Sequence, residues 1–352
     1  MIGILTFHRG PNHGGYLQAA ELVAAVRRAG HDVEIINYQN ARHHAGERFR
    51  PWVYRRPAKL WHAWRKYRAF RRALTELPMG EFTMASDSID WNRYDAVLVG
   101  SDVVWDYSQT RLGQDPVYFG SFRAAFRGRL ASYAPSCGMV DPRGAVPEWV
   151  EAGLGGFDRL SARDETTRSL VQRSTGHDCP LVVDPTWLPI AGRGDEHSAR
   201  GGKPGGYLAV YAFSIDAESA RMVREYARAS RLRIIASGYP HSWADEFRSS
   251  LTPSEWIEYL RNAAAVFVGT FHGALYSIRL GKRFAVLPND HIRAKLDTPI
   301  RMAGLEDRCV ACPEAIAEAL DRTRDLGETL DRLQAPVALS REYLGEVLEG
   351  RG

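Results

Sequence analysis

The chain has 352 residues, of which 45% are hydrophobic and 25% charged, a composition typical of a soluble protein with about two domains. The formal net charge of +4 is too small to indicate a nucleic-acid partner, and no apolar run approaches the about 18 residues that a membrane span needs. The four cysteines, Cys137, Cys179, Cys309 and Cys312, contain a single CxxC pair, which favours reduced thiols over a zinc site. Because no leader sequence follows Met1, we expect a cytoplasmic protein.

The chain opens with a predicted βαβ unit. Residues 2–7 and 33–37 are apolar enough for buried strands, and residues 16–28 carry apolar side chains at helical spacing. The loop after the first strand lies at a carboxyl end, where open α/β sheets bind ligands. It contains no GxGxxG dinucleotide motif. Its polar residues and glycines are candidates for a binding site: His8, Arg9, Asn12, His13, Gly14 and Gly15.

Residues 42–80 form an insertion of a different character, in which Arg and Lys alternate with Trp and Tyr. We expect a helix over 59–77, with prolines before it and after it. Its composition suits an amphipathic basic helix that contacts a membrane surface or an acidic polymer. It also suits a helix that packs its aromatic side on the domain and leaves its arginines in solvent. The second interpretation needs no partner and is the one we favour, but the sequence leaves both open.

The rest of the first half alternates between strands and helices. We expect strands at 94–99 and 130–134, a helix at 146–157, and short strands at 160–163 and 181–183. Gly100, Ser101 and Asp102 follow one strand, and Arg163, Asp164 and Glu165 open a helix after another. This alternation predicts a parallel α/β domain over 1–190 that also contains the insertion.

Residues 191–206 are rich in glycine and charge and predict a linker. Beyond it the alternation restarts, which predicts a second α/β domain over 207–335 and a helix in 336–352. The expected strands are 207–213, 232–236, 264–268 and 284–287, and the expected helices are 217–228, 252–262, 274–280, 295–305, 314–333 and 338–348. Two Rossmann-like domains imply a cleft between them, where we expect the substrate to bind.

The turn between residues 268 and 274 combines Gly269, Thr270, Phe271, His272 and Gly273. It joins a predicted buried strand to a helix, whose amino terminus suits an anion. His272 would there be able to exchange a proton near neutral pH. The alternative is a capped helix in which Thr270 is the N-cap and His272 only a hydrogen-bonded turn residue.

Four polar clusters therefore follow predicted strands, at residues 8–15, 100–102, 163–165 and 270–273. What they share is a set of cationic or donor groups: His8, Arg9, His13, Arg163, His272, Arg279 and Lys282. No acidic cluster has metal-ligand spacing, so we expect no obligatory metal, and neither GxSxG nor a P-loop is present. The residues indicate recognition of a small anion, with histidine available for proton transfer.

Five segments in order, GILTFHRGPNHGGYLQAAEL, YDAVLVGSDVVWD, ASYAPSCG, LSARDETT with VVDPTWL, and VFVGTFHGALYSIRLGKRF, together resemble the polysaccharide pyruvyl transferase family. The resemblance covers roughly residues 1–310, apart from the insertion at 42–77 and the linker. It implies a fold similar to the two-domain glycosyltransferase type B (GT-B) architecture. It also implies transfer of the pyruvyl group of phosphoenolpyruvate, a co-substrate, onto two sugar hydroxyls, with release of phosphate and without a cofactor.

The resemblance also suggests roles for individual residues. His272 would contact phosphoenolpyruvate and act as general acid, Arg163 would bind its anionic groups, and Asp102 would bind a sugar hydroxyl or act as base. Thr270, Phe271 and Gly273 complete the donor side, and the loop from His8 to Gly15 would shape the acceptor side. Relatives often carry serine or arginine where this chain has Thr270. If an arginine there contacts the donor in relatives, then Arg279 or Lys282 must substitute for it here, or the donor differs.

Two other functions stay open. One is a sugar transferase on the same fold with a nucleotide-sugar donor, for which the sequence shows no clear acidic ribose ligand after Gly273. The other is a non-catalytic glycan-binding or membrane-associated protein that uses the insertion. The acceptor of a transferase would be a lipid-linked repeat unit, a cell-wall polymer or a glycosylated small molecule. The insertion would suit a lipid-linked acceptor at the inner membrane face.

Overall fold

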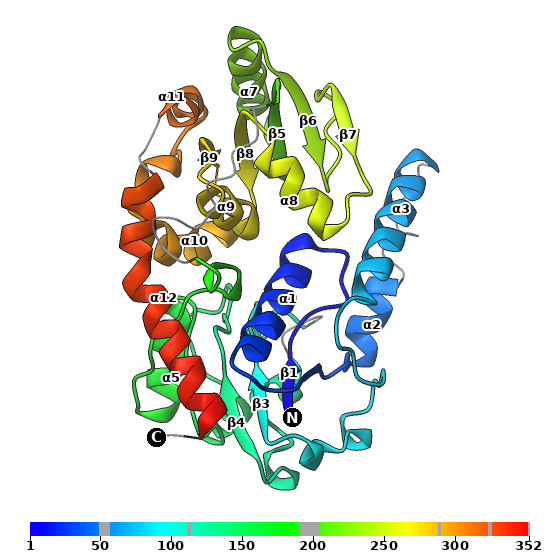
Figure 1. Ribbon diagram of the computed structural model, residues 1–352, viewed down its shortest axis with the longest axis vertical. Coiled ribbons are helices and arrows are strands. Elements are labelled where there is room, and N and C mark those ends of the chain that lie inside the picture. Colours follow the sequence, from blue (N-terminus) through cyan, green and yellow to red (C-terminus); the bar gives the residue numbers. More distant parts are fainter. Residues whose placement is uncertain are drawn as a thin grey trace. The chain divides into compact units, whose positions relative to one another are not determined.

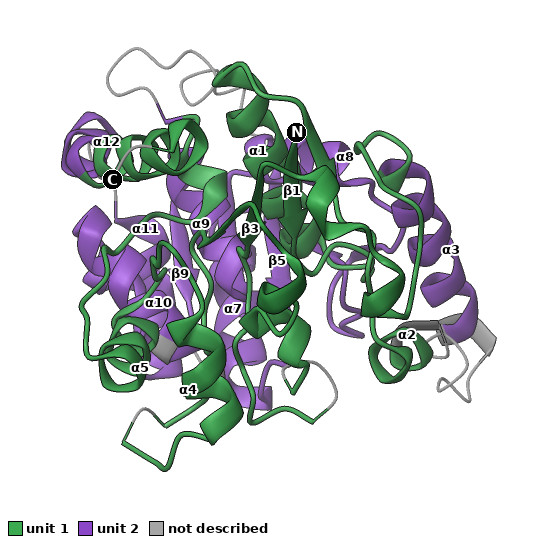
Figure 2. Ribbon diagram, turned by 90° about the horizontal axis from the view of Figure 1, so that it is seen from below, with its two compact units in different colours: residues 1–55, 74–189, 336–352 green, residues 56–73, 190–335 purple. Residues whose placement is uncertain are grey.

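The computed structural model describes residues 1–48, 57–110, 114–141, 143–190, 205–287, 290–322 and 326–350. The chain divides into two compact units, which Figure 2 distinguishes by colour. Unit 1 comprises residues 1–55, 74–189 and 336–352, and unit 2 comprises residues 56–73 and 190–335. Most of the predicted linker, residues 191–204, lies outside the described residues.

Unit 1 is built on a parallel sheet of four strands in the order β2-β1-β3-β4. Their bounds are Ile2–Leu5 for β1, Val33–Ile35 for β2, Ala96–Val99 for β3 and Arg129–Ser132 for β4. The register aligns Ile2 with Val33 on one side and with Ala96 on the other. Beside β4, Arg159 forms an isolated parallel bridge with Ala131, and Ala162 forms one with Leu181, in the region where the sequence predicted short strands. All four named strands were expected from their apolar runs.

The helices of unit 1 differ from the prediction mainly at their ends. They are α1 (His13–Arg28), α2 (Ala41–Arg48), α4 (Glu148–Gly155), α5 (Glu165–Thr175) and the last part of α12 (Leu326–Glu349). Helix α1 begins three residues before the predicted Tyr16, because the Asn12 side chain accepts a hydrogen bond from the Gly14 N–H and caps the helix. Helix α2 was not predicted, since ARHHAGER carries no apolar stripe.

Unit 2 contains a parallel sheet of five strands in the order β7-β6-β5-β8-β9, seen in Figure 1. The strands are β5 (Tyr207–Ala212), β6 (Arg233–Ser237), β7 (Glu246–Arg248), β8 (Ala265–Gly269) and β9 (Phe284–Val286). The sequence indicated all of them except the short polar edge strand β7. Both sheets are parallel, and their strands alternate with helices along the chain. This confirms the predicted α/β class.

The helices of unit 2 include one from the first half of the sequence. They are α3 (Pro57–Leu74), α7 (Ala217–Ala229), α8 (Pro253–Arg261), α9 (Phe271–Arg279), α10 (Asp290–Ala303) and α11 (Ile316–Asp321). Residues 56–73 belong to unit 2, whereas the sequence placed the insertion in the first domain. The predicted helix over 314–333 is wrong: α11 ends at Asp321, and α12 runs from Leu326 through Pro336 to Glu349.

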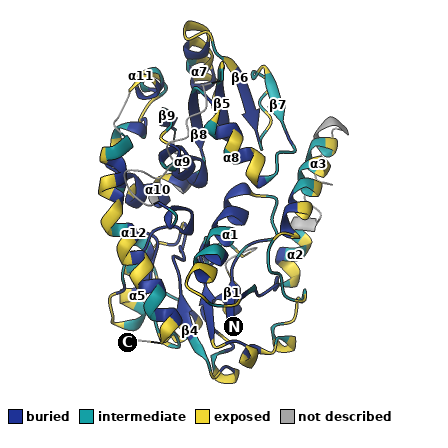
Figure 3. Cartoon of the chain, viewed as in Figure 1, coloured by how far each residue is buried: buried dark blue, intermediate teal, exposed yellow. Residues whose placement is uncertain are grey.

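Each unit has its own apolar core around its sheet. Apart from the edge strand β7, which is only partly buried, the strands consist mainly of buried residues, drawn dark blue in Figure 3. Trp105, Phe119 and Leu130 lie in the core of unit 1, and Phe267 and Ile316 in that of unit 2. Cys137 and Cys179 are buried and unpaired, and burial raises the pKa of both thiols.

Candidate active site

The polar clusters of unit 1 meet at the carboxyl edge of its sheet. The Thr6 hydroxyl after β1 donates to the Ser101 carbonyl at 3.0 Å, and the Ser101 hydroxyl after β3 donates to the Ala134 carbonyl at 2.8 Å. The Arg163 backbone N–H donates to the Pro135 carbonyl, which follows β4. The clusters around His8, Asp102 and Arg163, far apart in sequence, are therefore joined by hydrogen bonds within one unit.

Asp102 lies beside the amino terminus of α1. One of its carboxylate oxygens accepts from the Val103 N–H at 2.8 Å. The other lies 3.5 Å from the position that a Cβ on Gly15 would occupy. Asp102 itself has a left-handed backbone, with φ of 73°. The side chain is partly exposed, so a carboxylate stands at a helix end where negative charge is stabilised and a hydroxyl group can approach.

His8 and Arg9 converge on one amide. The Nδ1 and Nε2 atoms of His8 lie 2.8 Å from the Thr6 carbonyl and 3.2 Å from Asn37 Oδ1. Arg9 also donates to Asn37 Oδ1, at 2.8 Å, and stacks over Phe82. The Asn37 Oδ1 atom thus lies within hydrogen-bond distance of both side chains. This edge of unit 1 therefore gathers a histidine and an arginine around one amide oxygen.

The remaining residues of the segment that the sequence predicted as a loop belong to the start of α1. His13, Gly14 and Gly15 form the first turn of α1, and Asn12 is its N-cap. Gln18, in the next turn, donates to the Thr6 hydroxyl and the Phe7 carbonyl and ties the helix to the end of β1. The anticipated polar loop is therefore largely a helix amino terminus at the carboxyl end of a strand.

Arg163 is held by a buried ion pair. Its guanidinium donates to Asp184 Oδ2 at 2.9 Å, and both side chains are only 2% exposed. Asp184 also caps the 3₁₀ turn Pro185–Trp187 by accepting from the Thr186 N–H. Asp164 caps α5 by accepting from the N–H and hydroxyl of Thr167. The sequence singled out Arg163 but gave no indication of its partner 21 residues later.

In unit 2, the focal turn forms the amino terminus of α9. Thr270 is the N-cap, and its hydroxyl accepts from the Gly273 N–H at 3.2 Å. Phe271, His272 and Gly273 make up the first helical turn, so the helix starts three residues earlier than predicted. His272 is buried and contacts the Phe271 ring edge to face at 5.0 Å. The cap that the sequence suggested and the histidine at the helix end are both present, and neither interpretation excludes the other.

An aromatic cluster supports this helix end. The Tyr211 ring on β5 lies 4.9 Å from Trp256 and 5.5 Å from Tyr239, and Trp256 lies 5.4 Å from Tyr276 of α9. A Cβ on Gly273 would stand 3.2 Å from Tyr211 and 2.6 Å from the Thr270 hydroxyl. Glycine is therefore the residue that lets the first turn of α9 close against β5.

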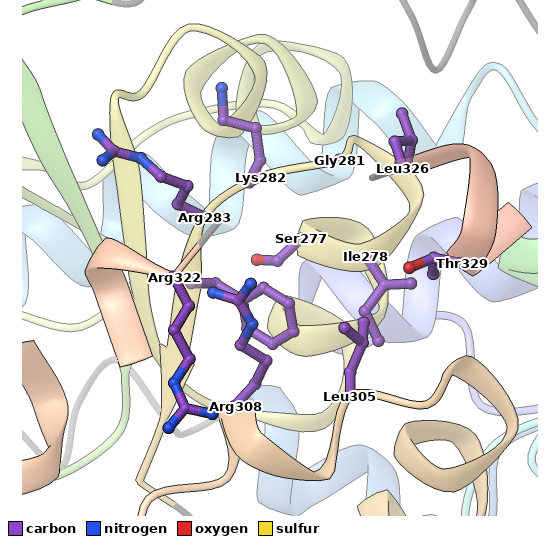
Figure 4. Close-up of a pocket in the computed structure, with 11 residues that line it drawn as sticks. Ser277, Ile278, Gly281, Lys282, Arg283, Leu305, Arg308, Arg322, Leu326 and Thr329 are labelled. Atoms are coloured by element: carbon purple, nitrogen blue, oxygen red, sulfur yellow. The ribbon is translucent and has the colours of Figure 1, made fainter. Parts of the chain in front are cut away.

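Arg279 and Lys282 lie at the other end of α9. Arg279 lies seven positions after His272 along the helix, a rise of about 10 Å. Lys282 donates to the Arg261 carbonyl and lines a cavity of about 230 Å³ with Ser277, Arg308 and Thr329. Figure 4 shows its ammonium group directed away from Arg308 and Arg322. The structure thus does not bring Arg279 or Lys282 to the first turn of α9, where a substitute for an arginine at position 270 would be needed.

Sequence reasoning missed a second histidine at this edge. His241 Nε2 lies 2.9 Å from the Ala212 carbonyl, so that nitrogen carries the proton that is donated. Ala212 pairs in register with Gly269, the last residue of β8. Burial lowers the pKa of His241, and the hydrogen bond to Ala212 opposes this shift. Its position after a predicted strand end was the available signal, because it follows β6 as His272 follows β8.

The arrangement provides hydrogen-bond donors and groups that can transfer protons. Among the described residues, no group of three or more His, Cys, Asp or Glu side chains is placed to hold a metal ion. Within the same residues, no helix is both long and apolar enough to cross a bilayer. The two edges offer a carboxylate, histidines, arginines and two helix amino termini, which suit anion binding and acid–base chemistry.

The fold is similar to that of solved two-domain enzymes. The UDP-GlcNAc 2-epimerase from Methanocaldococcus jannaschii superposes with a TM-score of 0.52 at 10% identity, over 96% of this chain and 99% of that chain. The T4 phage BGT in complex with UDP and Mn2+ gives a TM-score of 0.49 at 11% identity, over 99% of both chains. At these identities only the fold is shared, and the epimerase match carries that conclusion. The predicted GT-B-like α/β fold is confirmed.

The family is established by sequence. None of the curated proteins matches the chain. The family model described as polysaccharide pyruvyl transferase, however, matches residues 12–291, far more than half of the 352 residues. The matched region begins at the N-cap of α1 and extends beyond the His272 turn. The chain therefore belongs to the polysaccharide pyruvyl transferase family and is a transferase.

Proposed function

We propose that this transferase moves the pyruvyl group of phosphoenolpyruvate onto two hydroxyls of a sugar-containing acceptor and releases phosphate. Family membership supports the transfer. The observation that carries the choice of donor is the amino terminus of α9, where the buried His272 lies in the first turn at the carboxyl end of β8. A helix amino terminus beside histidine suits a small ligand that carries a phosphate and a carboxylate.

Unit 2 would bind the donor in this proposal. Backbone N–H groups of the first turn of α9 and the positive end of the helix dipole would face an oxygen-rich anion. His272 would donate a hydrogen bond to the donor and serve as general acid. Thr270 and Gly273 would fix the geometry of that turn through the cap. His241, which the family resemblance did not suggest, is a neighbouring group at the end of β5.

The proposed pyruvyl transfer requires one general acid and one general base. A proton added to the methylene carbon of phosphoenolpyruvate leaves a cationic centre at the neighbouring carbon, which one sugar hydroxyl attacks. Phosphate then leaves, and the second hydroxyl closes the cyclic ketal, so that two hydroxyl protons are released in total. Donors aimed at the departing phosphate and at the carboxylate stabilise the charge that develops.

Unit 1 would handle the acceptor. Asp102 is the proposed base or hydroxyl ligand, since its carboxylate is partly exposed beside α1. His8, Arg9, Asn12, His13, Gly14 and Gly15 would shape the surroundings of the sugar. Arg163 keeps the anion-binding role that the resemblance implies, and its pairing with Asp184 would fix the guanidinium in one orientation.

The acceptor would be a glycan, a lipid-linked repeat unit or a glycosylated small molecule. The proposal places the reaction in the cytoplasm, at the inner membrane face when the acceptor is lipid-linked. The alternative donor is a nucleotide sugar. The solved structures of similar fold share only the fold and do not favour this donor further. Donor identity is therefore the first point to test.

Thermal unfolding with phosphoenolpyruvate or a panel of nucleotide sugars, each without added metal, tests the donor. A ligand that binds only the folded protein raises the melting temperature by mass action. We expect a rise with phosphoenolpyruvate that His272→Ala abolishes and that His177→Ala, at an exposed histidine, retains. A rise with a nucleotide sugar alone would overturn the donor assignment. A rise with phosphoenolpyruvate that survives in His272→Ala would overturn the site.

A further inference from the structure

Helix α3 separates its side chains into two faces with different surroundings. Residues 62, 66, 70 and 73 follow one another at helical spacing and are buried or partly buried. Residues 61, 64, 65, 68, 71 and 72 lie on the opposite side and are exposed. We call this second set the outer face of α3. It contains Trp61, Trp64, Arg65, Arg68, Arg71 and Arg72.

The inner face holds α3 on unit 2. His62 Nδ1 lies 3.0 Å from the Ser249 hydroxyl, and its ring meets Phe247 of β7 edge to face. Lys66 donates to the Gly238 carbonyl at 3.3 Å, and its ammonium lies over the Tyr239 ring. Figure 2 shows α3 in the colour of unit 2. The helix is thus anchored by side chains that the outer face does not use.

The outer face of α3 exposes two tryptophans, whereas an ordinary surface helix turns such large apolar side chains inward. Trp61 is 51% exposed and Trp64 is 48% exposed. The sequence favoured an insertion that packs its aromatic side inward and solvates its arginines. That interpretation is wrong for both tryptophans, since they share the exposed face with the arginines. Exposed indoles side by side are costly in water and mark a surface that meets another phase or molecule.

The charge of this face is of one sign. The helix sequence PAKLWHAWRKYRAFRRAL contains no aspartate or glutamate. Arg65 lies 4.6 Å from the centre of the Trp61 ring, and Arg68 lies 4.7 Å from that of Trp64. Each pair thus places a guanidinium over an indole, which lets cation and ring enter a less polar environment together. The stripe from Trp61 to Arg72 is about 17 Å long.

We propose that the outer face of α3 is a docking surface for a membrane that contains anionic phospholipids. Tryptophan prefers the interfacial layer of a bilayer, and arginines beside it neutralise the lipid phosphates. A helix that lies flat presents the whole stripe to such a surface at once. A nucleic acid would match the charge, but its bases would have to stack on indoles that already carry a guanidinium on one face.

The surface is independent of the donor assignment, because no residue of the outer face belongs to the proposed active site. A failed test of phosphoenolpyruvate would leave it standing, and a failed vesicle test would leave the transfer reaction standing.

Co-sedimentation of the full chain with lipid vesicles tests the proposal. One vesicle consists of phosphatidylcholine, and the other of equal parts of phosphatidylcholine and phosphatidylglycerol. We expect salt-sensitive binding to the anionic vesicle alone. In R65Q/R68Q/R71Q, affinity should fall roughly fivefold for each arginine, or about a hundredfold in total. The control R224Q/R228Q/R231Q removes three exposed charges of α7 and its end in the same unit and should bind as the unmodified chain does.

Tryptophan emission supplies a second measurement. Anionic vesicles should shift the emission to shorter wavelength, and W61F/W64F should lose that shift because these two indoles enter the interface. Equal loss of binding in the α3 and α7 variants would show attraction by net charge only and would overturn the docking surface. Absence of vesicle binding would also overturn it. The same holds if the chain binds single-stranded RNA instead of vesicles and only the α3 variant loses that binding.

Discussion

The carboxyl edges of the two sheets use the same kinds of residue in different ways. At the edge of unit 1, Arg163 is paired with Asp184 inside the unit, and His8 and Arg9 share the Asn37 oxygen. At the edge of unit 2, the principal feature is a helix end, where Thr270 caps α9 and His272 lies in its first turn. A buried ion pair contributes to holding the first edge together, beside its hydrogen bonds, whereas backbone geometry and aromatic packing hold the second.

The difference predicts where mutations will cost stability and where they will cost function. An arginine that carries a buried ion pair cannot be removed without leaving its partner carboxylate in a poor environment. We expect the removal of His272 to cost less than the removal of Arg163, because the Thr270 cap and the aromatic cluster keep the turn in place.

Arg163→Met should destabilise the protein by about 3–5 kcal/mol, because Asp184 would remain buried without its cation. Urea unfolding followed by tryptophan fluorescence measures the loss. The matched control is Arg168→Met, which breaks the pair with Asp178 at the surface and should cost far less, because solvent screens an exposed pair. If the two variants lost the same stability, the idea that a buried ion pair helps to hold this edge together would be untenable. Arg163→Met with Asp184→Leu should recover part of the loss.

Gly273→Ala should cost about 1–3 kcal/mol, since the new Cβ would stand 2.6 Å from the Thr270 hydroxyl and 3.0 Å from Val268 Cγ1. Gly15→Ala is the counterpart at the amino terminus of α1 in unit 1. There the nearest atom would be 3.5 Å away, so alanine should be neutral or stabilise the helix by about 0.5–1 kcal/mol. Thermal unfolding of both variants decides the comparison, and a larger loss in Gly15→Ala would reverse it.

His241→Gln should change how stability depends on pH. Burial lowers the pKa of His241 in the folded chain, whereas in the unfolded chain it is about 6.5. Above that pH the ring is neutral in both states. As the pH falls, the unfolded chain binds the proton first, and stability is lost until the folded ring also titrates.

The melting temperature of the unmodified chain should therefore fall more steeply below about pH 6.5 than that of His241→Gln. Melting curves over a series of pH values measure the difference between the two proteins. A difference that does not vary with pH would mean that His241 does not titrate on unfolding.

The sequence was informative wherever a pattern is local. Apolar runs located eight of the named strands, and the Thr270 cap was recognised from its position before a helix. Helices α1 and α9 nevertheless begin earlier than predicted, because their first residues, His-Gly-Gly and Phe-His-Gly, resemble turns in the sequence. Glycine disfavours a helix interior, but in the first turn of α9 it allows the close approach to Thr270 that the fold requires.

Contacts between distant residues were beyond sequence reasoning. Nothing near Arg163 announces Asp184, and nothing in the insertion announces that His62 reaches Ser249, 187 residues away. The short edge strand β7 and the polar helix α2 carry no apolar period and were missed for that reason. The candidate residues were found as clusters, but their partners, which decide what each can do, were visible only in the structure.

The order of the chain does not match the order of the units, and this affects how the protein is made. Helix α3 leaves the ribosome long before the strands of unit 2 that receive His62 and Lys66. Unit 1 is completed only when the last residues of the chain have been synthesised. Ser340 accepts a hydrogen bond from the Val183 N–H, and Tyr343 donates one to the Ser132 carbonyl. A nascent chain halted at the glycine-rich segment would thus hold one incomplete unit and one orphan helix. Neither unit can finish folding until the other has been almost entirely synthesised.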